Sequence, residues 1–406
     1  MEICIKNGKV IDWSGTFEGD IYVKDGIITE IGRDLQKECK TIDLKGKVVM
    51  PGFVDLHVHF RDPGYTYKED IESGSKAAVK GGYTMVNLMA NTNPVCSSIE
   101  TVDYVVGKGK ELGLVDINQV VSITRDFDGN DVSHLDELDE SKVKIISEDG
   151  KDVMHSEVML KAMAKARAKN MTVMCHCENH DLSKVDMRLA ENTMTWRNIT
   201  LAGYAKCKVH LSHVSTKEAM EYVIQAKTKG QKVTCEVAPH HLALTDEIKY
   251  RVNPPLRKQE DVDSLIKAIE NGFVDSIATD HAPHSEEDKT KGSPGISGIE
   301  TAFPVCYTKL VRQNHISLNK LSELMSKRPS EILNVNKGTI DVGFDGDLVI
   351  VDLEKEYKID KNELISKGKN TPFHGKEVYG DVIMTIKGGK IVYLNEEYKE
   401  NFNDCR

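Results

Sequence analysis

Short apolar runs alternate with helical stretches through the middle of the chain, and this alternation limits the fold more than any other feature. Each run has the length and composition of a buried strand, and residues 156–170 have the periodicity of a helix. Repeated strand–helix units predict a parallel sheet, either open or closed into a barrel, because parallel neighbours need a crossover between them. The predicted strands lie at residues 84–90, 142–147, 171–177, 208–214, 232–239 and 274–280.

Both ends of the chain have a different pattern. Alternating apolar positions are separated there by the turns KNGK, KDG and KGGK, which are typical of β-hairpins. Two end segments of the same style predict one small composite β domain, formed by residues 1–50 and 340–406. Residues 51–339 would then form the α/β domain between them. Two unrelated β appendages are the alternative.

Charge and apolar content exclude several classes of function. The formal net charge of −10 argues against nucleic acid or an acidic membrane surface as a partner. No apolar run approaches the ~18 residues of a membrane span, and the N-terminal segment lacks the apolar core of a cleavable signal. The nine cysteines are scattered without a CxxC pair, as is usual for reduced thiols. We therefore expect a soluble, cytoplasmic protein.

Histidine and aspartate residues follow the predicted strands at their C-terminal ends. His57 and His59 are two residues apart in the run PGFVDLHVHFRDPG, so both side chains point to the same side of a strand. The C-terminal ends of barrel strands form one mouth, where α/β barrels place their active sites. Neutral imidazoles and carboxylates together suit a divalent ion of the zinc type. The predicted ligands are His57, His59, Asp149, His176, His213 and Asp280.

One anion in this set could bridge two metal ions. Asp149 is our candidate, and a pair of ions can polarise a substrate oxygen and generate a hydroxide. A carboxylated Lys144 would supply an equivalent anion, although an ordinary strand-edge lysine is the favoured interpretation. The sequence leaves open whether one or two ions bind.

An arginine follows the two strand histidines directly. Arg61 offers a two-pronged donor that matches a substrate carboxylate. Asn91, Asn253 and His284 lie in loops that would open at the same mouth. Ordinary turn chemistry is the alternative for the two asparagines, because Asn beside Pro is common in turns.

Five motifs in this order resemble one known family. HVHFRDPG, MANTNP, APHHL, NPPLR and ATDHAPH are similar to motifs of the dihydroorotases of the amidohydrolase superfamily, in particular the bacterial class I type. The resemblance spans nearly the whole chain. It departs from the family pattern at Ala90, at Glu148 and in the loop Ser293-Pro294-Gly295, where the family usually has proline, aspartate and Pro-Phe-Gly.

The resemblance implies a fold, a metal and a role for each site residue. The fold would be a metal-dependent TIM-like (β/α)8 barrel with the composite β domain, and the cofactor one or two Zn²⁺ ions. His57 and His59 would bind the first ion and His176 and His213 the second, with Asp149 as ligand or bridge. Asp280 would be both ligand and catalytic acid/base. The implied substrate-binding residues are His59, Arg61, Asn91, Asn253, His284, Pro294 and Gly295.

The implied reaction is the reversible hydrolysis of L-dihydroorotate to N-carbamoyl-L-aspartate in pyrimidine biosynthesis, with a metal-activated hydroxide attacking the ring amide. A homodimer is also implied, and association with aspartate transcarbamoylase is left open. One alternative is another cyclic amidase, such as a hydantoinase, dihydropyrimidinase or allantoinase. The second is a non-catalytic partner of aspartate transcarbamoylase.

Overall fold

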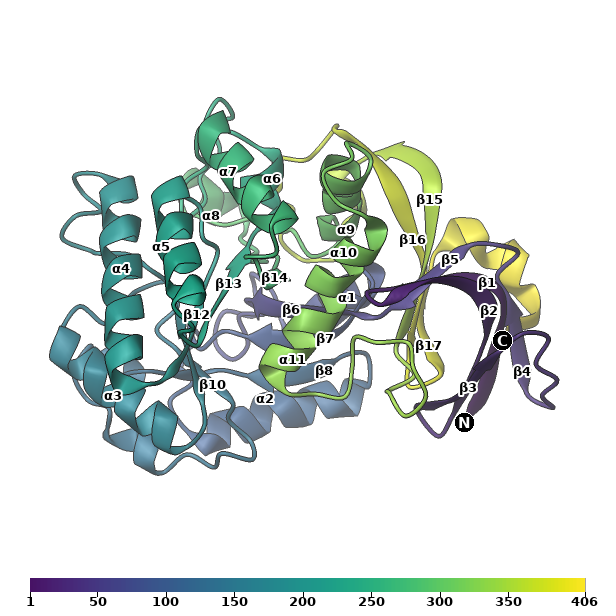
Figure 1. Ribbon diagram of the computed structural model, residues 1–406, viewed down its shortest axis with the longest axis horizontal. Helices are drawn as coiled ribbons and strands as arrows, with labels where there is room; N and C mark the ends of the chain where they lie inside the picture. Colours follow the sequence, from purple (N-terminus) through teal and green to yellow (C-terminus); the bar gives the residue numbers. More distant parts are fainter. Residues whose placement is uncertain (406) are drawn as a thin grey trace.

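Parallel strands in the middle of the chain form a barrel in the computed structural model, which describes residues 1–405 (Figure 1). β6, β7 and β8 pair in one sheet and β9 to β14 in another, and only Val120 separates β8 from β9. The backbone N–H of His59 donates to the carbonyl of His281 at 2.8 Å, and a parallel bridge pairs Val58 with His281, which closes the barrel. The closed alternative is therefore the correct one: the fold is a (β/α)8 barrel.

The barrel strands are short and end close to the predicted site residues. They are β6 (Phe53–Val58), β7 (Tyr83–Leu88), β8 (Asp116–Gln119), β9 (Val121–Ser122), β10 (Ile145–Ser147), β11 (Thr172–Cys175), β12 (Lys208–Leu211), β13 (Val233–Val237) and β14 (Ser276–Ile277).

Helices connect the strands and cover the outside of the barrel. The long helices α3, α4 and α5 pack side by side on one flank (Figure 1). Local signals fix where they begin: Asp70 forms a capping box with Ser73 at α1, and Thr216 caps α5. The helices are α1 (Ile71–Lys80), α2 (Ile99–Leu112), α3 (Ser156–Ala168), α4 (Met187–Ala205), α5 (Lys217–Thr228), α6 (Pro239–Ala243), α7 (Gln259–Glu270), α8 (Glu286–Thr290), α9 (Ala302–Cys306), α10 (Leu318–Ser322) and α11 (Arg328–Leu333). π-helical turns continue α9 over Tyr307–Val311 and α10 over Glu323–Lys327.

One further sheet combines strands from both ends of the chain. Its order is β17-β16-β15-β5-β1-β2-β3, with β4 paired to β1, and both chain ends lie at this end of the molecule (Figure 1). Its own apolar core includes Ile3, Ile21 and Ile350. The strands are β1 (Glu2–Asp12), β2 (Gly15–Lys24), β3 (Ile27–Gly32), β4 (Lys40–Asp43), β5 (Val48–Pro51), β15 (Leu348–Lys358), β16 (Glu377–Lys387) and β17 (Lys390–Leu394). The division at residues 50 and 340 stays a prediction, and this sheet is in keeping with it.

A buried lysine joins this sheet to the barrel. Lys337 Nζ lies 2.8 Å from Asp116 at the start of β8 and 2.5 Å from Asp347, which precedes β15. Among the helices of residues 1–405, none is both long and apolar enough to cross a membrane.

Candidate metal and substrate site

The C-terminal ends of the barrel strands surround a cavity of about 210 Å³. His57, at the end of β6, lies directly behind it against Asp149. All the other site residues predicted from the sequence line this cavity, and they come from separate strands and loops. The residues that line it are His59, Arg61, Asn91, Asp149, Gly150, His176, His213, Asn253, Asp280, Ala282, His284, Ser293, Pro294 and Gly295.

Each histidine of the first pair is held at one ring nitrogen and presents the other to carboxylates. His57 Nδ1 lies 2.7 Å from Glu236 Oε1, and its Nε2 lies 3.2 Å from Asp149 Oδ1. His59 Nδ1 lies 2.8 Å from Asn91 Oδ1, and its Nε2 lies 3.3 Å from Asp280 Oδ1. The Nδ1 atoms donate to oxygen acceptors, so the Nε2 atoms face the two aspartates.

The second pair of histidines also contacts Asp149. His176 Nδ1 and His213 Nε2 are 2.8 Å apart, at 3.6 Å and 3.9 Å from Asp149 Oδ1. The other ring nitrogen of His176 lies 3.0 Å from Glu178 Oε2, which also accepts a hydrogen bond from Asn253. Asp149 therefore contacts both histidine pairs, as a bridging ligand would.

This arrangement fits a bound cation. Burial lowers the pKa of His59, and the Nε2 lone pair of this neutral ring repels the carboxylate of Asp280 when nothing positive lies between them. His57 Nε2 and Asp149 Oδ1 are buried, and neither has a hydrogen-bond partner among the described residues. Ligand atoms within 4.8 Å of one another form two groups that share His57: one adds Asp149 and His213, the other His59 and Asp280. A nitrogen and oxygen donor set of this kind suits one or two divalent ions.

Protonation in the metal-free centre follows from the same contacts. Burial lowers the pKa of His57, but Asp149 and Glu236 outweigh burial and hold that pKa well above its usual value. Burial raises the pKa of Asp149, and the neighbouring histidines, His57 first, reverse this and keep it well below its ordinary value. Burial and the cationic neighbours lower the pKa of His213 to about 4. His213 is therefore neutral at pH 7 and can act as a ligand, whereas His57 must first lose a proton.

Three site residues have a left-handed backbone that residues other than glycine seldom adopt. The φ angles are +60° at Arg61, +33° at His213 and +47° at Asp280. Each of these residues follows a barrel strand closely, where the bend turns its side chain into the cavity. Strain of this kind is concentrated at functional sites.

A cationic subsite adjoins the predicted ligands. Arg61 Nη2 lies 3.4 Å from His284 Nε2, and Arg61 Nε is buried without a hydrogen-bond partner among the described residues. Gly295 has a φ of +138° and lies so close to the loop after β14 that a Cβ there would be 2.7 Å from the carbonyl oxygen of Ala282. Glycine at this position therefore lets the backbone form the wall of the cavity beside His284.

Lys144, the alternative source of a bridging anion, is held by backbone carbonyls instead. Lys144 Nζ donates to the carbonyls of Leu333 and Asn334, at 3.1 Å and 3.2 Å, so an ordinary structural lysine is the interpretation that the structure favours. His241, in the APHHL motif, is anchored at 3.0 Å to the carbonyl of Pro254.

Sequence reasoning missed the carboxylates that hold the ligands. Burial raises the pKa of Glu236, but hydrogen bonds from His210 and His57 reverse this and hold the pKa at about 2. Asp55 accepts hydrogen bonds from the backbone of His57 and of Thr279, which ties β6 to the loop that ends in Asp280. Both acids sit inside apolar strand runs, and a charged residue in a buried strand is the signal that could have identified them.

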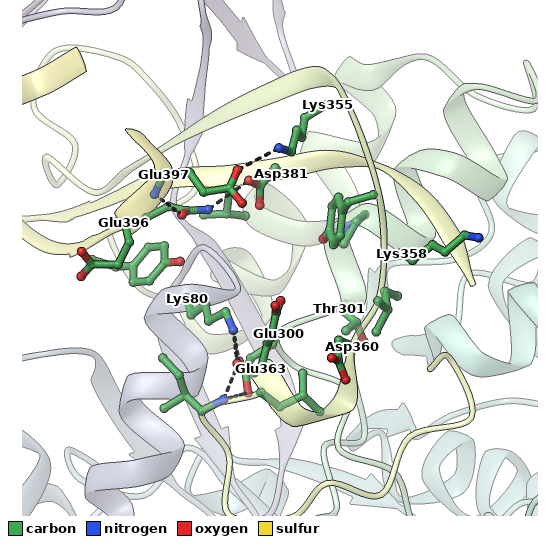
Figure 2. Close-up of a pocket in the computed structure, with 18 of the residues that line it drawn as sticks. Lys80, Glu300, Thr301, Lys355, Lys358, Asp360, Glu363, Asp381, Glu396 and Glu397 are labelled. Carbon is green, nitrogen blue, oxygen red and sulfur yellow. Dashed lines mark hydrogen bonds and ion pairs between the residues drawn. The ribbon is translucent and has the colours of Figure 1, made fainter. Parts of the chain in front are cut away.

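A larger hollow of about 830 Å³ lies elsewhere, beside the strands near the C-terminus (Figure 2). Its charged groups are largely paired: Lys80 with Glu300 at 3.0 Å and Lys355 with Glu397 at 2.8 Å (Figure 2). None of the described residues that line it is a histidine. The histidine-lined cavity is therefore the candidate active site, although it is the smaller of the two.

Comparison with known proteins decides the family. The model of the Amidohydrolase family matches residues 48–392. A dihydroorotase of Clostridium botulinum (strain Eklund 17B / Type B) is 55% identical over 97% of this chain and 100% of that protein. A dihydroorotase of Bacillus subtilis (strain 168) is 40% identical over 97% of this chain and 98% of that protein. The chain belongs to the dihydroorotases of the amidohydrolase family.

Solved structures of a hydantoinase and a dihydropyrimidinase have the same fold as this amidohydrolase. An L-hydantoinase (dihydropyrimidinase) from Arthrobacter aurescens superimposes with a TM-score of 0.89 at 27% identity, over 96% of this chain and 95% of that one. A dihydropyrimidinase from Brevibacillus agri NCHU1002 gives a TM-score of 0.86 at 25% identity, over 98% of this chain and 96% of that one. The barrel with its β-rich end is thus shared with hydantoinases, whereas the sequence groups with the dihydroorotases.

Proposed function

We propose that this amidohydrolase catalyses the reversible hydrolysis of L-dihydroorotate to N-carbamoyl-L-aspartate. One observation supports dihydroorotate as the substrate. The guanidinium of Arg61 lines the cavity beside the ligand cluster and has no carboxylate partner among the described residues. A buried cation of this kind calls for an anion, and the dihydroorotate ring carries a carboxylate.

Zinc is the proposed metal. His57 and His59 would hold one ion and His176 and His213 a second, with Asp149 between them and Asp280 facing the first pair. When bound, a divalent ion supplies Lewis acidity and lowers the pKa of water to about 7. The nitrogen and oxygen donors of the two ligand groups, which share His57, support a zinc-type ion.

Asp280 is the proposed proton carrier. Burial raises its pKa, but the contact with His59 and the positive charge of His57 reverse this and hold the pKa far below its ordinary value. Its carboxylate is therefore ionised at pH 7 and can accept the proton of the attacking water. The same carboxylate then delivers that proton to the ring nitrogen as the amide C–N bond breaks. In the direction of ring closure, Asp280 takes the proton from the carbamoyl nitrogen.

Arg61 and His284 would bind the substrate carboxylate and so orient the ring carbonyl toward the histidine cluster. Asn253 has a buried Oδ1 without a hydrogen-bond partner among the described residues, and it lines the same cavity. This oxygen can accept from a ring N–H. A charged contact to the carboxylate typically contributes about 1.5–3 kcal/mol.

The two alternatives lack this support. A hydantoinase or dihydropyrimidinase substrate has no ring carboxylate for Arg61 to bind, although the fold is shared. A non-catalytic partner of aspartate transcarbamoylase would have no need of a complete ligand set. We further propose, from the resemblance, a cytoplasmic homodimer, and we leave association with the transcarbamoylase as a possibility for the same reason.

The substitution Arg61→Met in the metal-loaded protein tests the proposal. We expect kcat/KM for dihydroorotate to fall on the order of 10- to 100-fold, while the metal content stays at the wild-type level. Arg125→Met is the matched control, because Arg125 pairs with Asp131 away from the cavity. Wild-type kcat/KM in Arg61→Met would refute the assignment of the substrate.

A further inference from the structure

A second cation lies behind the proposed carboxylate subsite. After Arg61 the chain turns back on itself, with Tyr65 N donating to Arg61 O and Lys68 N to Tyr65 O. The turn carries Lys68 Nζ to 3.4 Å from His284 Nδ1, on the side of the ring opposite to Arg61. Lys68 does not line the cavity, whereas Arg61 and His284 do.

Arg61 and Lys68 would each need a ring nitrogen of His284 as a hydrogen-bond acceptor. A neutral imidazole has one N–H donor and one acceptor nitrogen, and lysine and arginine can only donate. Burial, Arg61 and Lys68 lower the pKa of His284 to about 3, so the ring is neutral at pH 7. Only one of the two contacts can therefore be a hydrogen bond. The other brings two donors face to face at 3.4 Å.

Contacts around Lys68 indicate which nitrogen accepts. Lys68 Nζ is 3.5 Å from Asp288 and lies over the rings of Tyr65 and Tyr67, at 5.7 Å and 5.5 Å from their centroids. Only 16% of the Lys68 side chain is exposed. The ammonium is thus fixed beside Nδ1, which becomes the acceptor. The hydrogen of the ring then lies on Nε2, toward the cavity and Arg61.

The conflict on the Arg61 side disappears when an anion binds there. A carboxylate oxygen between His284 Nε2–H and the Arg61 guanidinium accepts from both groups. The backbone N–H of His284 donates to Asn370 Oδ1 at 2.9 Å. This hydrogen bond holds the backbone of His284 in place beside the carboxylate subsite.

We propose that Lys68 is a positioning residue for the substrate carboxylate: it donates to His284 Nδ1 and thereby fixes the tautomer whose Nε2–H, together with Arg61, binds the carboxylate. This inference rests on the proposed function and names a specificity determinant for it. A cyclic amide without a carboxylate gains nothing from this arrangement.

Lys68→Met in the metal-loaded full chain tests the proposal. We expect KM for dihydroorotate to rise on the order of tenfold, with kcat and metal content close to wild type. The dissociation constant of orotate, which has the same ring carboxylate, should rise by a similar factor. Uracil, which lacks the carboxylate, should bind both proteins equally. Lys68→Arg should restore KM, because it keeps a charged donor.

Lys291→Met is the matched control, because Lys291 pairs with Glu287 on α8 and its side chain is 69% exposed. Its KM should equal that of the wild type. Unchanged KM and orotate affinity in Lys68→Met would overturn the inference, as would equal losses for orotate and uracil. If Lys68→Met is unstable, Lys68→Leu, which also lacks a donor, serves in the same comparison, with the same expected rise in KM and the same refuting outcomes. Failure of the wild type to open dihydroorotate would instead refute the proposed function.

Discussion

Replacing Glu236 by glutamine should weaken metal binding without touching a ligand. Glu236 Oε1 lies 2.7 Å from His57 Nδ1 and Oε2 lies 3.0 Å from His210 Nε2, and the residue is fully buried. Glutamine keeps the shape but exchanges charged hydrogen bonds of about 1.5–3 kcal/mol for neutral ones of about 1 kcal/mol. The difference, about 1–2 kcal/mol, acts through the orientation and basicity of His57. It corresponds to a loss of roughly 5- to 30-fold in metal affinity, which overlaps the range of about 10- to 100-fold for groups that orient metal ligands.

The assay is competition for zinc between the protein and a chromophoric chelator at fixed pH. Glu191→Gln is the matched control, because Glu191 is also buried but binds Ser215 and Arg257 away from the centre. We expect it to lower the free energy of unfolding and to leave zinc affinity unchanged. Equal zinc affinity in Glu236→Gln and wild type would refute the reasoning. An equal loss in both variants would show a general effect of destabilisation.

Three further outcomes are expected. Asp280→Asn should lose about 10²- to 10⁴-fold in kcat while folding normally, and wild-type kcat would contradict its role as proton carrier. The metal-free protein should release a proton when zinc binds at pH 7, because Asp149 and Glu236 hold the pKa of His57 well above its usual value and keep this histidine protonated there. Zinc affinity should therefore rise with pH, and calorimetry in two buffers that shows no proton release would contradict this. Lys337→Met should lower the free energy of unfolding by about 3–5 kcal/mol, because Asp116 and Asp347 lose their buried partner, and an unchanged denaturant midpoint would contradict this.

The sequence predicted which residues lie together as candidate ligands because their positions depend on local pattern. A strand alternates its faces, so His57 and His59 share a side, and parallel strands of a barrel end at one mouth. The same rules located His213 and Asp280 at the ends of their strands. Each of these inferences needs only a few neighbouring residues and the fold class.

Residues that hold the ligands could not be predicted in the same way. The contact between His57 and Glu236 joins residues 179 positions apart, across the barrel from β6 to β13. Lys68 reaches His284 only because the chain turns back after Arg61, whose φ of +60° is not signalled by its residue type. The observed strand ends also differ from the predicted ones. The strand predicted over 274–280 is assigned only at Ser276–Ile277, and the backbone leaves the extended conformation at Asp280, where φ is +47°.

The most direct test is turnover by the purified, zinc-supplemented protein. Dihydroorotate, dihydrouracil, hydantoin and allantoin are offered separately, and the ring-opened product of each is quantified. The account predicts selective opening of dihydroorotate, since only that ring carries the carboxylate that Arg61 and His284 are placed to bind. Opening of a carboxylate-free ring at a comparable rate would contradict it, and so would the absence of any turnover by protein that has bound its metal.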